Sequence, residues 1–209
     1  MSSRIKISCI TPSIRPDGLK VTFENLQKQT MPRDDWEWLP RLSVPNTTPD
    51  LCYQCNQALR EAKGELVVFL QDWIHIDDTA LQDIWDSHEA GYGYTFPVGK
   101  VYNKDGTGEV KWDWRNAVRS EGPRVPWMHW EIDYGAASRQ AIIDAGLFDE
   151  AFDSGFGWEN NDLARRMAKL GTIFEVNRNI KARAWDHDQF VDHPYKKKPN
   201  NKLFDSKNL

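Results

Sequence analysis

The sequence predicts an α/β fold: a single domain whose mixed, mostly parallel sheet is flanked by helices. Residues 4–10 are largely apolar and β-branched, and residues 66–70 show no polar alternation, as expected for strands covered on both faces. Between the strand-like segments lie segments with apolar residues at helical spacing. This alternation of strands and helices is typical of parallel sheets. A chain of 209 residues fits one hydrophobic core.

The first half of the chain alternates strands and helices. The first strand is predicted over 4–10, and a helix over 19–30 follows because apolar residues recur there at helical spacing. Residues 36–42 suggest a second strand, weak or at a sheet edge because Pro40 cannot donate a ladder hydrogen bond. Residues 46–63 are predicted to form a helix that starts with capping residue types and a proline.

The rest of the chain continues this alternation around one irregular stretch. Residues 103–130 have no clear period and combine four tryptophans with glycines and prolines, which is typical of a functional loop. The other predicted elements are, in order, a strand over 66–70, a helix over 79–89, a strand over 91–102, helices over 138–145 and 162–170, and a strand over 172–176.

Composition excludes several classes of protein. A net charge of −4 and a pI of about 5.8 argue against nonspecific binding to nucleic acid, which needs many lysines and arginines. The basic run 196–198 lies in a polar tail, 191–209, that we expect to be solvated. No signal peptide or membrane span is predicted, so we expect a cytoplasmic protein without a membrane partner. Cys52 and Cys55 are predicted to pack in the core.

Asp72 is the first candidate for chemistry. It follows the central strand at 66–70, and ligands of α/β sheets bind at the carboxyl ends of such strands. A carboxylate there can hold a divalent cation such as Mg²⁺ or Mn²⁺, which would neutralise the phosphates of a nucleotide. The alternative is that Asp72 is a surface loop residue. Asp77 and Asp78 are expected to be structural, with Asp77 capping the helix over 79–89.

Two more groups of acids accompany aromatic or histidine residues. Glu159 and Asp162 lie at a helix start, where acids suit the helix dipole, but a cap needs only one of them. Trp158 beside them is typical of a sugar-binding wall, where an aromatic face covers the ring and carboxylates bind hydroxyls. His187 stands between two aspartates after a predicted strand, an arrangement in which histidine can bind a metal.

Three segments between residues 7 and 171 resemble, in order, the GT-A glycosyltransferases of the family 2 type with a galactosyltransferase-like C-terminal region. They are ISCITPSIRPDGLKVTFENLQKQT, NQALREAKGELVVFLQDWIHIDD and DYGAASRQAIIDAGLFDEAFDSGFGWENNDLARRMAKLG. The resemblance implies a single GT-A (Rossmann-like) domain over 1–190, followed by the tail 191–209. The nucleotide-sugar-binding half would be about 1–100, and the acceptor or catalytic half about 130–190.

The resemblance also implies an activity: inverting transfer of a sugar from a nucleotide-diphosphate donor to an acceptor hydroxyl, with Mn²⁺ or Mg²⁺ on the diphosphate. The residues implied to bind the nucleotide sugar are Thr11, Pro12, Arg15, Asp72, Gly135 and Trp158. The implied metal ligands are Asp72 and His187. The general base would be Glu159 or, second, Asp162, and the implied contacts to a carbohydrate or other hydroxyl acceptor are Trp158, Asn160 and Asn161.

Two amides of the chain stand where the family's pattern has acids. Gln71 stands where the acidic motif has another acid, and Asn160 where many relatives have the catalytic base. These amides leave open a second hypothesis, a catalytically degenerate protein that binds nucleotide sugars or carbohydrates. A third hypothesis is a glycosyltransferase acting on modified bases of DNA, since some proteins of this type are phage-encoded and the tryptophan-rich loop suits nucleic acid.

Overall fold

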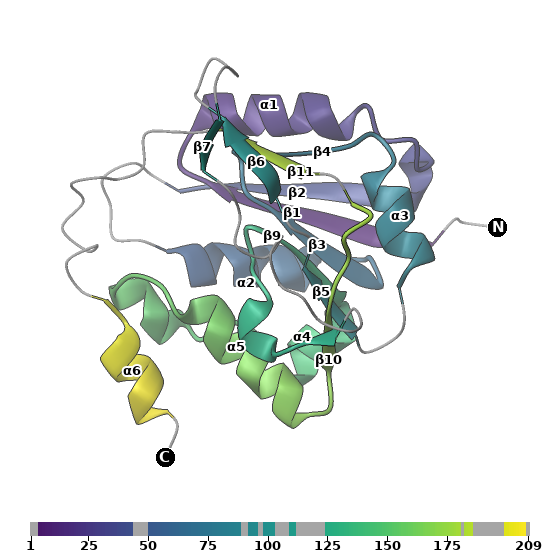
Figure 1. The fold of residues 1–209 in the computed structure, drawn as a ribbon. Helices are drawn as coiled ribbons and strands as arrows, with labels where there is room; N and C mark the ends of the chain where they lie inside the picture. The colour runs from purple at the N-terminus through teal and green to yellow at the C-terminus, as the bar shows by residue number, and fades with distance from the viewer. Residues whose placement is uncertain are drawn as a thin grey trace.

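Helices cover both faces of a central seven-stranded sheet in the computed structural model (Figure 1). One face packs against α1 (Pro16–Leu26) and α3 (Ala80–Asp86), and the other against α2 (Leu51–Glu61), α4 (Arg139–Asp144) and α5 (Glu159–Lys169). The structure describes residues 4–43, 50–88, 92–95, 98–102, 109–111, 124–180, 182–185 and 199–207.

The central sheet is mixed and mostly parallel, as predicted. Its strands are, in spatial order, β2 (Trp36–Leu42), β1 (Ile7–Ser13), β3 (Leu66–Leu70), β9 (Tyr134–Ser138), β5 (Tyr92–Thr95), β10 (Ile173–Val176) and β8 (Arg124–Val125). β9 and β8 run antiparallel to the other five strands. β2 lies at the edge, where a strand tolerates Pro40, because one side of an edge strand needs no partner.

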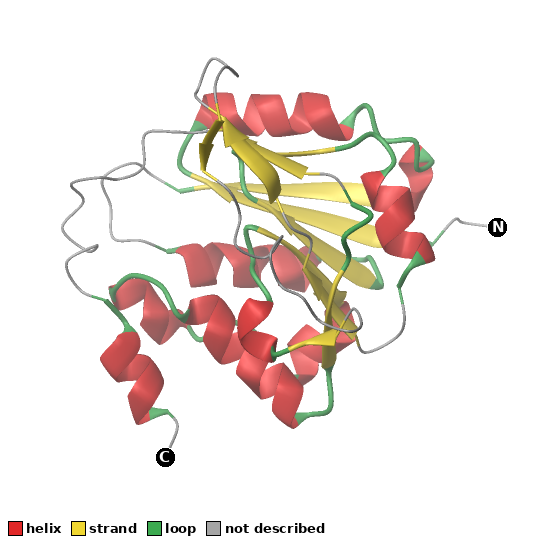
Figure 2. Ribbon diagram, viewed as in Figure 1, coloured by secondary structure: helices red, strands yellow, loops and turns green. Residues whose placement is uncertain are grey.

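A second sheet of four strands lies beside the first. Its strands are, in spatial order, β4 (Ile74–Ile76), β11 (Ala182–Trp185), β6 (Val98–Tyr102) and β7 (Glu109–Lys111). The sequence predicted one strand over 91–102, and this prediction is wrong, because β5 and β6 belong to different sheets (Figure 2). Pro97 lies between them in the sequence, and proline cannot donate to a ladder.

The strand and helix boundaries around the carboxyl edge of β1 differ from the prediction. β1 continues to Ser13, beyond its last pairing with β3 at Ile10, because its register with β2 extends to Leu42. α1 begins at Pro16 rather than at residue 19, since the fixed φ of proline suits the first turn and its missing N–H is not needed there. Only two residues therefore connect β1 to α1.

The core divides into two clusters, one on each face of the central sheet. β3 supplies both clusters: Leu66, Val68 and Leu70 face the α1 side, whereas Val67 and Phe69 face α2 and α5. This alternation confirms that β3 is buried on both faces. Cys52 and Cys55 pack in the second cluster, and burial raises the pKa of both thiols, which disfavours the thiolate needed for metal or redox chemistry.

A distant side chain binds the first turn of α2, and the side-chain cap predicted for α3 is absent. The carboxylate of Asp153 accepts hydrogen bonds from the backbone N–H groups of Cys52 and Tyr53, at 2.8 and 3.0 Å, in the first turn of α2. The capping residues predicted for α2 at 46–48 lie outside the described residues. The predicted side-chain cap by Asp77 is wrong, because only its backbone carbonyl accepts a hydrogen bond from the first residue of α3.

Residues 199–207 are folded, although the sequence predicted a solvated tail. They contain α6 (Asn201–Ser206), whose Phe204 side chain is buried against the second core cluster. The prediction fails here because one large apolar side chain in a polar segment is enough to dock a short helix. The basic run 196–198 lies outside the described residues. In the described part of the chain, no helix has the length and apolar character to cross a membrane.

Candidate functional site

Arg15 and Asp72, both predicted site residues, form an ion pair at the carboxyl edge of the central sheet. Asp72 follows β3, and Arg15 lies between β1 and α1. The Asp72 carboxylate accepts hydrogen bonds from Arg15 Nε, at 2.9 Å to Oδ2, and from Arg15 Nη2 to Oδ1. Ser13 Oγ donates a third hydrogen bond to Oδ2, at 2.5 Å. Both oxygens of Asp72 are therefore engaged by donors of Ser13, at the end of β1, and of Arg15, in the loop before α1.

The first turn of α1 closes another side of the Asp72 carboxylate. A Cβ atom at Gly18 would lie 2.4 Å from Asp72 Oδ2, so the approach of α1 requires a glycine here. A helix N-terminus also favours a negative charge. Sequence reasoning missed both Ser13 and Gly18 as members of the site. A glycine within the first helical turn, where it is a poor helix former, was the available signal for Gly18.

Thr11 and Pro12, predicted to face the nucleotide, lie within β1 and are buried. The Thr11 hydroxyl accepts a hydrogen bond from Trp38 Nε1, at 3.0 Å. Gly135, predicted to let the backbone approach the donor sugar, lies in β9. A Cβ atom there would lie 2.2 Å from the carbonyl oxygen of Glu131, so the tight turn before β9 by itself requires the glycine. Contact of these three residues with a donor stays a prediction.

The turn before β9 joins the Asp72 edge to the start of α5. The backbone N–H of Gln71 donates to the carbonyl oxygen of Asp133, at 2.9 Å. The side-chain amide of Asn160 donates to Glu131 Oε2 and to the Trp130 carbonyl, both at 3.0 Å. Asn160 is therefore buried in structural hydrogen bonds, and its predicted acceptor contact stays untested. Asn161 also binds this region, through a 3.4 Å hydrogen bond to the Met128 carbonyl.

Glu159 carries the largest carboxyl pKa perturbation of this region. Its side chain is partly buried in the first turn of α5, and burial raises its pKa from 4.5 to about 7. A hydrogen bond from its own backbone amide acts in the opposite direction, whereas the nearby charges of Asp133 and Asp153 add to the rise. A carboxyl with a pKa near 7 can accept and release a proton at neutral pH.

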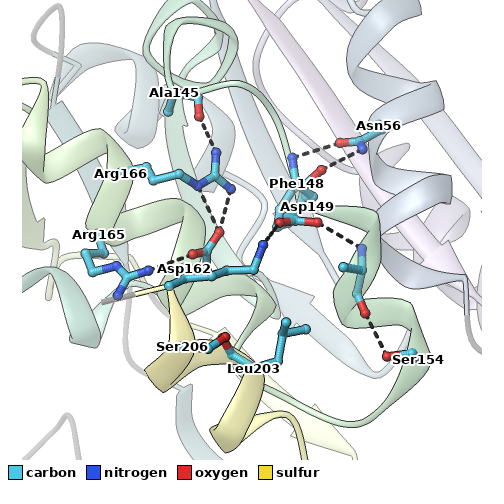
Figure 3. Close-up of polar contacts among 12 residues, drawn as sticks. Asn56, Ala145, Phe148, Asp149, Ser154, Asp162, Arg165, Arg166, Leu203 and Ser206 are labelled. Atoms are coloured by element: carbon cyan, nitrogen blue, oxygen red, sulfur yellow. Dashed lines mark hydrogen bonds and ion pairs between the residues drawn. The ribbon is translucent and has the colours of Figure 1, made fainter. Parts of the chain in front are cut away.

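Asp162, the second candidate base, is held by two arginines (Figure 3). Its Oδ1 accepts a hydrogen bond from Arg165 Nη2 at 2.9 Å, and its Oδ2 from Arg166 Nε at 2.8 Å. Arg166 also donates to the carbonyl of Ala145 at the end of α4. Asp162 is 2% exposed, and each of its carboxylate oxygens accepts a hydrogen bond from an arginine. One of these arginines, Arg166, also connects α5 to the end of α4. This geometry favours Glu159 over Asp162 as the base.

Trp158 is positioned by α6. It precedes α5 in a left-handed backbone conformation, with φ 76°, and is 41% exposed. Its ring stacks on Phe204, with centroids 4.8 Å apart, and Arg165 lies 4.5 Å from the centroid of Phe204 on α6. Asn200 holds the same loop, since its amide donates to the carbonyl of Gly157 at 3.1 Å. The C-terminal segment thus orients the aromatic side chain predicted to bind sugar.

The structure describes only one of the two predicted metal ligands, so the predicted metal site stays a prediction. None of the groups of histidine, cysteine, aspartate and glutamate in the described residues brings together three or more side chains that could hold a metal. Asp72 is paired with Arg15, and His187 lies outside the described residues. Gln71 offers only a neutral amide at the position of the missing acid.

A mixed sheet whose central strand brings an acid to its carboxyl edge, with an acidic helix start beside it, matches the GT-A glycosyltransferase fold, which the similar solved structures show. No protein-family model and no curated protein sequence matches the chain. Solved structures of other proteins are similar to this chain. S. aureus TarS superposes with a TM-score of 0.61 at 17% identity, over 86% of this chain and 37% of TarS.

Two further structures show the same similarity and contain ligands. GalNAc-T7 with UDP, GalNAc and Mn²⁺ has a TM-score of 0.63 at 14% identity, over 90% of this chain and 45% of that one. The mannosyltransferase PcManGT from Pyrobaculum calidifontis with GDP-Man and Mn²⁺ has a TM-score of 0.62 at 15% identity, over 91% and 59%. The chain therefore spans between about a third and three fifths of these proteins, and the similarity shows the fold.

Proposed function

We propose that this chain is a glycosyltransferase that moves a sugar from a nucleoside-diphosphate sugar to an acceptor hydroxyl. The observation that carries the proposal is Glu159: a partly buried carboxyl with a pKa of about 7, at the start of α5. The donor class is supported by the similar structures, which contain GDP-Man in PcManGT and UDP-GlcNAc in a TarS complex. The exposed ring of Trp158 next to Glu159 favours a carbohydrate acceptor.

The proposed reaction inverts the anomeric carbon in one displacement. The acceptor oxygen forms a bond to the anomeric carbon as the bond from that carbon to the β-phosphate oxygen breaks, and the hydroxyl proton passes to Glu159. The nucleoside diphosphate leaves with the electron pair, and the guanidinium of Arg15 is the positive charge proposed to face it. General base catalysis is typically worth about 10²- to 10⁴-fold, so Glu159 should account for a factor in this range.

The structures of GalNAc-T7 and PcManGT contain Mn²⁺, which supports a divalent cation as a cofactor in proteins of this fold. The described residues of this chain do not fit one, because both oxygens of Asp72 already accept hydrogen bonds from Arg15 and Ser13. Magnesium and manganese need several oxygen ligands in a defined geometry, and one engaged carboxylate does not supply them. The proposed chemistry therefore rests on Glu159 and Arg15.

The test is release of nucleoside diphosphate from a panel of UDP- and GDP-sugars, with sugars and water as acceptors. We expect turnover of at least one donor, a product of inverted anomeric configuration by NMR, and a loss of about 10²- to 10⁴-fold in E159Q. The matched control is E24Q, which removes the charge of an exposed glutamate on α1. If no donor is turned over, the proposed transfer activity is wrong. If in addition no donor raises the Tm, the proposed donor class is wrong as well.

The alternative of a catalytically degenerate binding protein is supported by Asn160, an amide committed to structural hydrogen bonds where many relatives have the base. Its signature would be a donor that raises the Tm without release of nucleoside diphosphate. Action on modified DNA bases is disfavoured by the net charge of −4, and a salt-dependent shift of DNA in a gel would revive it.

A further inference from the structure

The two side chains of the Arg15–Asp72 ion pair differ in exposure: the carboxylate is buried and the guanidinium lies nearer to solvent. The Asp72 side chain is 5% exposed, whereas that of Arg15 is 26% exposed. A ligand that approaches this edge of the sheet therefore meets a guanidinium rather than a carboxylate. A divalent cation could reach Asp72 only by displacing Arg15, and this would leave the guanidinium without its counter-charge.

The other sides of the Asp72 carboxylate are also occupied. Ser13 donates to Oδ2 at 2.5 Å, and the first turn of α1 is so close that a Cβ atom at Gly18 would lie 2.4 Å from the same oxygen. Gln71, the neighbouring residue, is a neutral amide. At this position the chain therefore offers one negative charge, that of Asp72, and Arg15 already neutralises it.

We propose that this chain binds the diphosphate of its donor without a divalent cation, with Arg15 in the cation's place and Asp72 as the residue that positions Arg15. The inference rests on the proposed function. A guanidinium has five N–H donors in a rigid plane and matches phosphate oxygens well. Asp72 engages Nε and Nη2, and Nη1 donates to none of the described residues, so donors remain for a phosphate.

Asp72 contributes to this site by orientation. Two parallel hydrogen bonds from one guanidinium to one carboxylate fix its plane and direction, whereas a free arginine side chain would lose conformational entropy on binding. The negative charge of Asp72 itself opposes an approaching diphosphate. Loss of that charge and loss of Arg15 should consequently have different effects on nucleotide binding.

The experiment measures the dissociation constants of UDP and GDP by calorimetry, once in EDTA and once in Mn²⁺. For the wild-type chain we expect the tighter nucleotide to bind with the same constant, within about threefold, in both conditions. R15Q should weaken binding by about 10- to 100-fold, the range expected for hydrogen bonds to a charged group. D72N should weaken it less than R15Q does, and equally in EDTA and in Mn²⁺.

Two further variants keep the test decisive. R60Q is the matched control, because Arg60 is an exposed arginine on α2 and its loss should leave the dissociation constants unchanged. R15Q leaves Asp72 buried without its partner, so the double variant R15Q/D72N serves if R15Q does not fold. The double variant removes both charges and should bind nucleotide as weakly as R15Q.

The possible outcomes separate this inference from the proposed function. Binding that requires Mn²⁺, and that D72N abolishes, would make Asp72 a metal ligand and overturn the inference while leaving the proposed function in place. Binding that is independent of Mn²⁺ but unaffected in R15Q or R15Q/D72N would also overturn it. Absence of UDP and GDP binding in every condition would instead count against the nucleotide-sugar donor itself.

Discussion

Replacement of Glu159 by glutamine should stabilise the protein, and the gain should depend on pH. In the folded chain, burial raises the pKa of Glu159 from 4.5 to about 7. Well below pH 4.5 the carboxyl is protonated in both the folded and the unfolded state and does not change the free energy of unfolding. As the pH rises from 4.5 to 7, the unfolded state loses this proton first, so the stability of the folded chain falls, and above pH 7 the penalty is constant.

The size of the penalty follows from the pKa. At about 1.4 kcal/mol per pH unit, a rise from 4.5 to about 7 corresponds to about 3 kcal/mol in the free energy of unfolding. E159Q removes the charge and keeps the shape, so its gain should be near zero at pH 4.5 and approach about 3 kcal/mol at pH 8. For a domain of this size, that is about 6–12 °C in Tm.

The assay is urea unfolding of the wild-type chain and of E159Q at a series of pH values between 4.5 and 8, with E24Q as control. Glu24 is an exposed residue of α1, so E24Q should change stability by less than about 0.5 kcal/mol at every pH. A difference between wild type and E159Q that is the same at pH 4.5 and pH 8 would refute the raised pKa. It would also remove the main argument for Glu159 as the base.

Four other outcomes follow from the same contacts. Activity should rise with pH and level off above about 7, because the base acts when Glu159 is deprotonated, and a rate independent of pH between 5 and 8 would contradict this. G18A should destabilise the fold by about 1–3 kcal/mol in urea unfolding, since Arg15 and Ser13 prevent Asp72 from moving aside. D162N should destabilise the fold by about 3 kcal/mol, because it leaves two arginines unpaired, and lower the rate of the folded enzyme by less than tenfold; a loss as large as that of E159Q would make Asp162 the base. F204A should cost about 3 kcal/mol and speed amide exchange in α6, whereas L170A, at an exposed position, should do neither.

The sequence by itself determined most of the elements between β1 and α3, and a candidate residue at the edge of their sheet. An unbroken apolar run is sufficient to predict β3 as a central strand, because burial on both faces leaves no polar alternation. The position of Asp72 after β3 predicted a ligand site at the carboxyl edge of the sheet, whereas Arg15 was assigned to that site only by the resemblance to GT-A glycosyltransferases. Glu159 was singled out as an acid at a helix start beside Trp158, and its role as general base came from the resemblance.

Only the tertiary structure decided what these side chains do. The pairing of Arg15 with Asp72 joins residues 57 positions apart, and the cap of α2 by Asp153 joins residues about 100 positions apart. The docking of Phe204 on Trp158 and the insertion of β9 between β3 and β5 are equally long-range. Periodicity and capping patterns report only the nearest turns of the chain. A buried acid can be neutralised by an arginine, left unpaired or used as a helix cap. Which of these occurs depends on the distant side chain that the fold brings to it, and the sequence around the acid does not specify that side chain.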